Sequence, residues 1–201
     1  MPSKLEIEIK LPLPGAAHGR ALLRKAGFSL THKREFESNV VLDTPDRSLR
    51  NGGCLLRVRE HGARRIVTFK QPSIPGKHRS RPETEFEVSD IDAAAAVFES
   101  LGFTPAFRYE KFRSEYQRLG ERGVAMLDHT PIGDFLELEG SPRWIDRIAK
   151  AIGFRECDYI TVSYGQLYFA HCLERGVEPG HMVFERHSVR AAAPRSRRGL
   201  R

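Results

Sequence analysis

The sequence predicts an α+β protein in which many strands and few helices form a β-sandwich or a β-barrel. Two observations predict this fold. Short stretches along the chain alternate charged and apolar residues with the period of two that half-buried strands show. Segments with helical start and stop signals are fewer, and three of them end in glycine followed by phenylalanine. The apolar face of each strand is the one that helices or a second layer should cover.

The first strand, Leu5 to Leu11, shows the alternation most clearly. Glu6, Glu8 and Lys10 alternate with apolar residues, so all three charges share one face of an extended chain. Two carboxylates at this spacing stand close enough to hold one cation between them, and they repel each other unless a metal or a base neutralises them. The stretch is therefore either an edge strand with its charged face in water or part of a charged site.

Four helices are expected, and each is followed by a glycine that can supply a left-handed cap. Ser141 followed by Pro142 is a typical helix start. The last helix has an apolar stripe, which predicts that it packs on the body of the protein. The expected helices run from about Ala16 to Lys25, from near Asp92 to Leu101, from Ser141 to Ile152, and from Tyr159 or Ser163 to Leu173.

The remaining extended segments carry charges in phase. They lie around residues 36–43, after Gly52-Gly53, at 66–70, from residue 81, at 109–116, at 126–128 and at 135–139. Arg81 shares a face with the acids that follow it. The basic set is Lys10, Arg57, Arg59, Lys70, Lys111 and Arg113, and the acidic set is Glu6, Glu8, Glu83, Glu85, Glu87, Asp128, Glu137 and Glu139.

Length and composition suit one domain with a tail. The chain has 201 residues, of which 40% are hydrophobic and 29% charged. No signal peptide or bilayer-spanning run is visible, so we expect a cytoplasmic protein with no membrane partner. The cysteines Cys54, Cys157 and Cys172 are odd in number and widely spaced, which argues against a disulfide framework or a zinc site and fits a reducing compartment.

The net charge of +7 is concentrated at the C-terminus. Residues 186–201 hold six arginines and no acid, so +7 less these six charges leaves +1 for the rest of the chain. We therefore expect a structured domain over residues 1–178 and a basic, disordered tail over residues 179–201. A nearly balanced body makes nucleic acid an unlikely partner.

The charged faces have two interpretations. They form surface salt bridges on an open sheet, or, if the sheet closes, they converge on one polar cavity. Unpaired burial of so many charges would be prohibitive, so such a cavity must be compensated internally or hold ions. A ligand that satisfies both signs carries many anionic oxygens for the arginines and lysines, and brings hard divalent cations such as Mg²⁺ or Mn²⁺ for the carboxylates. A metal-bound triphosphate meets this description.

The order of these motifs resembles the CYTH superfamily, the triphosphate tunnel metalloenzymes. Glu6 to Lys10 reads ExExK, the signature of that family, and the resemblance extends over roughly residues 3–175. ExExK alone is a weak signal, whereas the ordered series is specific. The series continues with Asp43-Thr44-Pro45, Leu56-Arg57-Val58-Arg59, Thr68-Phe69-Lys70, Arg81 with Glu83 and Glu85, Lys111-Phe112-Arg113, Leu127-Asp128 and Glu137-Leu138-Glu139.

The resemblance implies an eight-stranded antiparallel barrel, open as a tunnel and flanked by helices, that binds a triphosphate with one or two divalent metals, Mg or Mn. It implies substrate binding by Lys10, Arg57, Arg59, Lys70, Arg81, Lys111 and Arg113, all but Arg81 also acting in catalysis. It implies metal binding by Glu6, Glu8, Glu85, Asp128, Glu137 and Glu139. One position departs from the family, because Val162 precedes Ser163-Tyr164 where relatives commonly carry Lys or Arg.

Three functions are compatible with this reading. The first is hydrolysis of ATP, thiamine triphosphate or tripolyphosphate by a monomer or homodimer. The second is cyclisation of ATP to cyclic AMP and pyrophosphate, as in class IV adenylyl cyclases. The third is a non-catalytic module that binds triphosphate or polyphosphate, which the loss of a basic residue at Val162 favours. We favour hydrolysis, because it requires no pocket for a base and ribose.

Overall fold

The computed structural model describes residues 3–185. Within them the chain forms eight strands, five α-helices and one short 3₁₀ helix. The strands are β1 (Lys4–Leu13), β2 (Ser29–Asp43), β3 (Leu55–His61), β4 (Arg64–Lys70), β5 (Arg79–Glu87), β6 (Thr104–Gln117), β7 (Val124–Thr130) and β8 (Gly133–Glu139). The helices are α1 (Ala16–Lys25), α2 (Ser48–Asn51), α3 (Ile91–Ser100), α4 (Pro142–Ala151), η1 (Glu156–Asp158) and α5 (Tyr164–Arg175).

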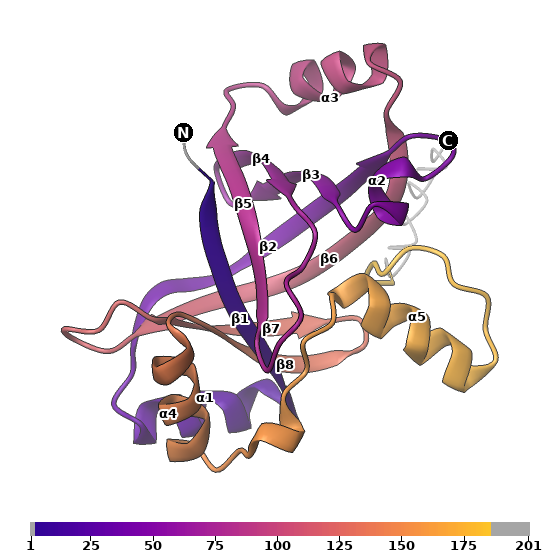
Figure 1. The fold of residues 1–201 in the computed structure, drawn as a ribbon. Coiled ribbons are helices and arrows are strands. Elements are labelled where there is room, and N and C mark those ends of the chain that lie inside the picture. The colour runs from indigo at the N-terminus through magenta and orange to yellow at the C-terminus, as the bar shows by residue number, and fades with distance from the viewer. Residues whose placement is uncertain (1–2, 186–201) are drawn as a thin grey trace, which may run out of the picture.

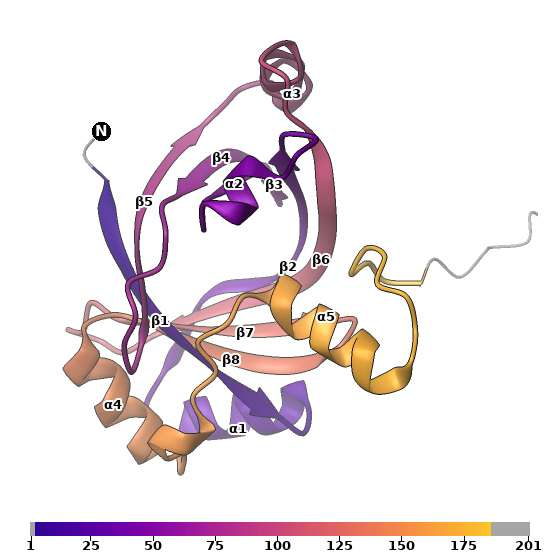
Figure 2. The same cartoon turned by 45° about the vertical axis from the view of Figure 1, so that its right-hand side comes forward.

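The strands form one closed barrel in the order β1-β5-β4-β3-β2-β6-β7-β8, with every neighbouring pair antiparallel. This confirms the predicted eight-stranded antiparallel barrel flanked by helices. Figure 1 shows α1 and α4 together on one side of the barrel and α3 on the opposite side, and Figure 2 shows the same arrangement from a second direction. No helix among residues 3–185 is both long and apolar enough to cross a lipid bilayer.

The strand register explains which face of the sheet points inward. In the pair formed by β1 and β8, Glu8 lies opposite Glu139 and Lys10 opposite Glu137, so the charged residues of both strands share one face. The alternate residues Ile9 and Leu11 are fully buried on the other face. They join the main hydrophobic core, which is formed with Leu23 of α1 and with Trp144, Ile145 and Ile148 of α4. The charged face therefore lines the interior, and the apolar face lies under helices.

The predicted helix ends agree with the observed caps. The Ser141 hydroxyl accepts a hydrogen bond from the Trp144 amide at 3.3 Å, and Pro142 occupies the first turn of α4. The Ser163 hydroxyl caps α5 at its start, and Gly176 ends it in the left-handed conformation.

The sequence patterns missed part of β2 and two short helices. β2 begins at Ser29 rather than near residue 36, and its pairing with β6 shifts register between Leu30 and His32 and again between His32 and Glu35. Such irregularities break the period of two on which strand prediction depends. Helices α2 and η1 span only four and three residues, which is too short for a helical period to appear.

The structured part of the chain continues beyond residue 178, where the tail was expected to begin. Met182 is fully buried and pairs with β6, donating its amide to the Arg108 carbonyl at 3.0 Å and accepting from the Glu110 amide at 2.9 Å. The Phe184 ring lies 5.3 Å from Phe112. Residues 179–185 thus include a segment that packs on the barrel, whereas the basic stretch 186–201 lies outside the described residues.

Two truncations test this boundary. Deleting residues 181–201 removes Met182 and Phe184, and we expect the free energy of unfolding to fall by about 3 kcal/mol, the scale of losing one buried apolar side chain with its hydrogen bonds. Deleting only residues 186–201 should leave stability within about 0.5 kcal/mol of the full chain. Urea unfolding monitored by circular dichroism measures both. Equal stability of the two truncated chains would contradict the assigned role of the 181–185 segment.

Candidate functional site

One cavity of about 1010 Å³ occupies the barrel interior and opens at its ends. Twelve of the thirteen site residues predicted from the sequence line it. They are Glu6, Glu8, Lys10, Arg57, Arg59, Lys70, Arg81, Glu85, Lys111, Arg113, Glu137 and Glu139. Charged residues outside that set also line the cavity, namely Lys4, Asp43, Arg47, Arg50, Arg64, Arg79, Glu83 and Glu115.

The interior charges are paired across neighbouring strands. Lys10 Nζ donates to Glu8 Oε1 at 2.8 Å and lies 3.3 Å from Glu137 Oε2. Lys70 forms ion pairs with Glu6 of β1 and, at 3.1 Å, with Glu83 of β5. These side chains come from strands far apart in the sequence, so only closure of the barrel brings them together. The pairing offsets part of the cost of removing the charges from water.

Asp128 is the one predicted site residue that does not line the cavity. It is fully buried on β7, where its carboxylate accepts hydrogen bonds from Arg113 at 2.6 and 2.7 Å, from Lys111 at 3.0 Å and from the Tyr164 hydroxyl at 2.7 Å. Both oxygens are therefore engaged by protein donors. In this arrangement Asp128 orients two cavity cations and joins α5 to the barrel.

Glu37 is a site residue that the sequence reasoning missed. It is fully buried on β2, with Oε1 accepting from the Asn39 amide at 2.9 Å and lying 3.5 Å from Lys111 and 3.7 Å from Arg59. Burial alone would raise its pKa, but the cations Arg59 and Lys111 hold the pKa of Glu37 well below its usual value. The available signal was that Glu37 is in phase with Asn39 on β2.

The second ExE pair contains two carboxylates in opposite electrostatic environments. Burial opposes ionisation of Glu137, yet Lys10 and Arg113 lower its pKa well below the usual value. Burial and the nearby carboxylate of Glu6 instead raise the pKa of Glu139. Glu139 therefore sits where negative charge is crowded, and a bound cation would relieve that crowding.

Glu6 and Glu139 belong to what we call the acidic end of the barrel, where β1 begins and β8 ends. Because neighbouring strands are antiparallel, Glu85 of β5 and Glu115 of β6 lie at the same end. Two exposed cations, Lys4 and Arg64, also lie there. The opposite end is the one at which β2 ends and β3 and β6 begin.

The acidic end fits a divalent cation that arrives with phosphate. Among residues 3–185, no three acidic, histidine or cysteine side chains converge closely enough to hold a metal by themselves. Mg²⁺ usually takes only one or two protein carboxylates and completes its shell with phosphate oxygens and water. Glu6, Glu8 and Glu139, in register on β1 and β8, supply ligands of that kind.

Val162 lies outside the cavity wall. Its side chain is exposed, whereas the adjacent Ser163 and Tyr164 line the cavity. The position at which relatives commonly carry a basic residue is therefore at the rim, next to the capped start of α5.

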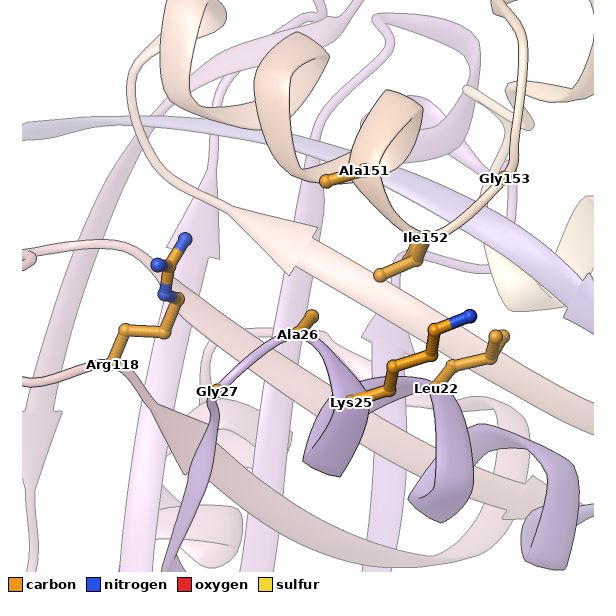
Figure 3. Close-up of a pocket in the computed structure, with 8 residues that line it drawn as sticks. All are labelled: Leu22, Lys25, Ala26, Gly27, Arg118, Ala151, Ile152 and Gly153. Atoms are coloured by element: carbon orange, nitrogen blue, oxygen red, sulfur yellow. The ribbon is translucent and has the colours of Figure 1, made fainter.

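A second hollow, of about 590 Å³, lies outside the barrel between the C-terminal ends of α1 and α4 (Figure 3). It is lined by Leu22, Lys25, Ala26, Gly27, Arg118, Ala151, Ile152 and Gly153, and none of the predicted site residues is among them. Its two cations, Lys25 and Arg118, face no comparable set of carboxylates in its wall. The charge pattern identified in the sequence therefore converges in the barrel and not here.

The depressed pKa of Glu37 predicts a specific dependence on pH. A carboxyl group whose pKa is lower in the folded state adds stability above its ordinary value of 4.5 and loses that contribution as pH falls below it. At pH 7, Glu37→Gln should lower the free energy of unfolding by about 3 kcal/mol, because it leaves Lys111 and Arg59 without a buried partner. The difference from the wild-type protein should shrink as pH falls from 4.5.

Urea titrations between pH 7 and pH 3.5 measure this difference. Glu60→Gln is the matched control, because Glu60 is exposed and only 3.9 Å from Arg65 in an outer ion pair. It should have little effect at any pH. A Glu37→Gln protein as stable as the wild type at pH 7, or one whose deficit does not change with pH, would contradict the assignment.

Comparison with known proteins places this geometry in a family. The family model described as the CYTH domain matches residues 4–151. A protein of Methanocaldococcus jannaschii named "Putative adenylate cyclase MJ0240" is 29% identical over 174 residues, which cover 81% of this chain and 98% of that protein.

Solved structures share the fold. The PH1012 protein from Pyrococcus horikoshii OT3 has a TM-score of 0.68 and 25% identity, covering 79% of this chain and 96% of that one. A Hippeastrum protein, described as "Putative adenylyl cyclase HpAC1" with a dominant triphosphatase activity, has a TM-score of 0.59 and 20% identity, covering 87% and 97%. With a family model that spans well over half of its length and a barrel of matching architecture, the chain belongs to the CYTH domain family.

Proposed function

We propose that this protein is a divalent-metal-dependent enzyme that binds a triphosphate inside the barrel and hydrolyses a phosphoanhydride bond. The observation that carries the proposal is the convergence of seven predicted cations and five predicted carboxylates on one cavity. Anionic oxygens suit the first group, and a metal bound to those oxygens suits the second.

The cations supply both binding and charge stabilisation. Lys10, Arg57 and Lys70 come from β1, β3 and β4, so they can contact phosphate oxygens from several sides. Negative charge that develops on those oxygens as the bond breaks would be met by donors already in place.

Arg57 supports this role because it is buried and its Nε has no hydrogen-bond partner among the described residues. Its other nitrogens bond to the Tyr109 hydroxyl at 2.9 Å and to the Thr68 hydroxyl at 3.1 Å, which fixes the guanidinium. A buried donor without a partner is costly, and a phosphate oxygen would satisfy it.

Asp128 and Glu37 support the site from behind. Asp128 fixes Arg113 and Lys111, while Glu37 lies 3.5 Å from Lys111 and 3.7 Å from Arg59. Glu6, Glu8 and Glu139 would hold the metal, which would polarise the phosphoryl group and neutralise charge on it. The acidic end would keep these carboxylates beside the phosphates only when that charge is balanced.

A second candidate is cyclisation of ATP, favoured by the name of the M. jannaschii relative, which is 29% identical. Cyclisation needs the 3′-hydroxyl of the substrate aimed at the α-phosphate, whereas hydrolysis needs a water beside the phosphate that leaves. Both reactions use the same set of charges. That the CYTH fold accommodates triphosphate hydrolysis is indicated by the description of the Hippeastrum protein.

A product assay separates these activities. Purified protein is incubated with tripolyphosphate, thiamine triphosphate or ATP, each with Mg²⁺, with Mn²⁺ and without metal. We expect orthophosphate release that requires the metal. Cyclic AMP with pyrophosphate as the main products from ATP would establish the cyclase instead. Binding of triphosphate without any product would leave only the binding module.

A pair of variants locates the activity in the barrel. Arg57→Ala should lower turnover by about 100-fold, the scale of losing one fixed donor to a developing charge. Arg65→Ala, on β4 and exposed in an ion pair with Glu60, should leave turnover unchanged. Equal turnover in both variants would place the chemistry elsewhere.

A further inference from the structure

The cavity extends beyond its charged section. At the end where β2 ends and β3 and β6 begin, its wall becomes largely apolar and aromatic. We call this the aromatic end, and its apolar wall consists of Val41, Leu42, Leu55, Ala106, Phe107, Gly165, Phe169, Pro179 and Gly180. An inorganic chain of phosphates exposes only charged oxygens, so it gains nothing from such a surface.

The aromatic wall is continuous with the phosphate-binding section. The Phe107 ring stacks on Tyr109 with centroids 6.1 Å apart and planes 24° apart, and the Tyr109 hydroxyl bonds to Arg57 at 2.9 Å. On its other side Phe107 lies 6.1 Å from Phe169 of α5. A group attached to a phosphate held at Arg57 therefore meets aromatic rings next.

Arg50 covers the wall from the rim. Its Cζ lies 5.1 Å from the centroid of the Phe169 ring, which brings α2 against α5, as the neighbouring positions of these helices in Figures 1 and 2 show. A guanidinium held on an aromatic ring is itself a flat surface on which a heteroaromatic ring stacks.

Asp43 fixes the segment that carries Arg50. It is buried, and its carboxylate accepts backbone hydrogen bonds from Thr44 at 2.8 Å, Leu49 at 2.9 Å and Arg50 at 3.0 Å. The Asp43-Thr44-Pro45 motif thus positions a rim arginine.

We propose that the aromatic end is a subsite for a flat aromatic head group, so that the substrate is a triphosphate esterified to a ring-bearing alcohol rather than inorganic tripolyphosphate. Phe169 and Phe107 would stack on the ring, with Arg50 above it, and the phosphates would continue towards Arg57 and the acidic end. This inference rests on the proposed function, because it assumes that the charged section holds the triphosphate. Nucleoside and thiamine triphosphates both have the required chemistry.

Calorimetric titration in Mg²⁺ tests the subsite with three probes: tripolyphosphate, ATP and thiamine triphosphate. Non-hydrolysing conditions are obtained by replacing ATP with a β,γ-methylene analogue if turnover interferes. The wild-type protein should bind at least one ring-bearing probe about tenfold more tightly than tripolyphosphate. Phe169→Leu, which keeps apolar volume but removes the ring, should abolish that advantage and leave tripolyphosphate affinity unchanged.

Leu173→Ala is the matched control, because Leu173 lies one turn further along α5 and is largely exposed. It should bind all three probes like the wild type. Phe169→Ala serves as a second test if Phe169→Leu retains partial stacking. Which of ATP and thiamine triphosphate loses affinity identifies the source of the ring.

Two results overturn the inference in distinguishable ways. If tripolyphosphate binds as tightly as both ring-bearing probes, or if Phe169→Leu and Phe169→Ala weaken all three probes equally, the subsite is wrong while the triphosphate site stands. If the wild-type protein binds none of the three, the proposed function fails and the subsite fails with it.

Discussion

The structure depends on the pairing of charges inside a closed barrel. Residues such as Lys10, Glu37, Asp128 and Glu137 are almost completely buried, and isolated ions at that depth would cost more free energy than a domain of this size has to spare. Pairing across strands makes the interior tolerable, and it requires strand closure, because Lys10 meets Glu137 only when β8 lies beside β1. The same requirement explains why the apolar residues of these strands face the helices. An interior built this way is stable enough to fold but has no strong preference for its own partners, since buried ion pairs gain little net free energy.

That weak preference is what suits the barrel to a charged ligand. A triphosphate that enters with a divalent cation offers new partners of both signs, so ion pairs such as Lys70 with Glu83 can be exchanged and not simply broken. The charges are also graded along the barrel axis, with Glu6 and Glu139 crowded at one end and Arg50 beside Phe107 and Phe169 at the other. A ligand that is ring-bearing at one end and metal-bound at the other has the complementary polarity. Asp128 and Glu37 do not take part in the exchange, because they stay buried behind the cations that they position.

The alternation of Glu6, Glu8 and Lys10 with apolar residues was enough to predict a charged strand face, and the ordered repetition of such strands was enough to predict the barrel and most of its lining. What local patterns could not predict was spatial neighbourhood. Asp128 has the same period as the other carboxylates, yet its position beneath Arg113 and Tyr164 follows from how β7 and α5 pack. Glu37 was missed because the bulged start of β2 obscures the period of its strand. The aromatic end was missed for a related reason: Phe107, Phe169 and Arg50 come from three elements whose proximity no single motif encodes.

The central claim is that the carboxylates of the acidic end face the phosphates through a metal. Calorimetric titration of tripolyphosphate with and without Mg²⁺, into the wild-type protein and into Glu139→Gln, tests it most directly. The account predicts that Mg²⁺ strengthens binding to the wild type by about tenfold or more, and that Glu139→Gln loses this gain while binding metal-free tripolyphosphate at least as well, since one repelling charge is gone. Binding that ignores Mg²⁺ in the wild type, or an undiminished Mg²⁺ effect in Glu139→Gln, would contradict it.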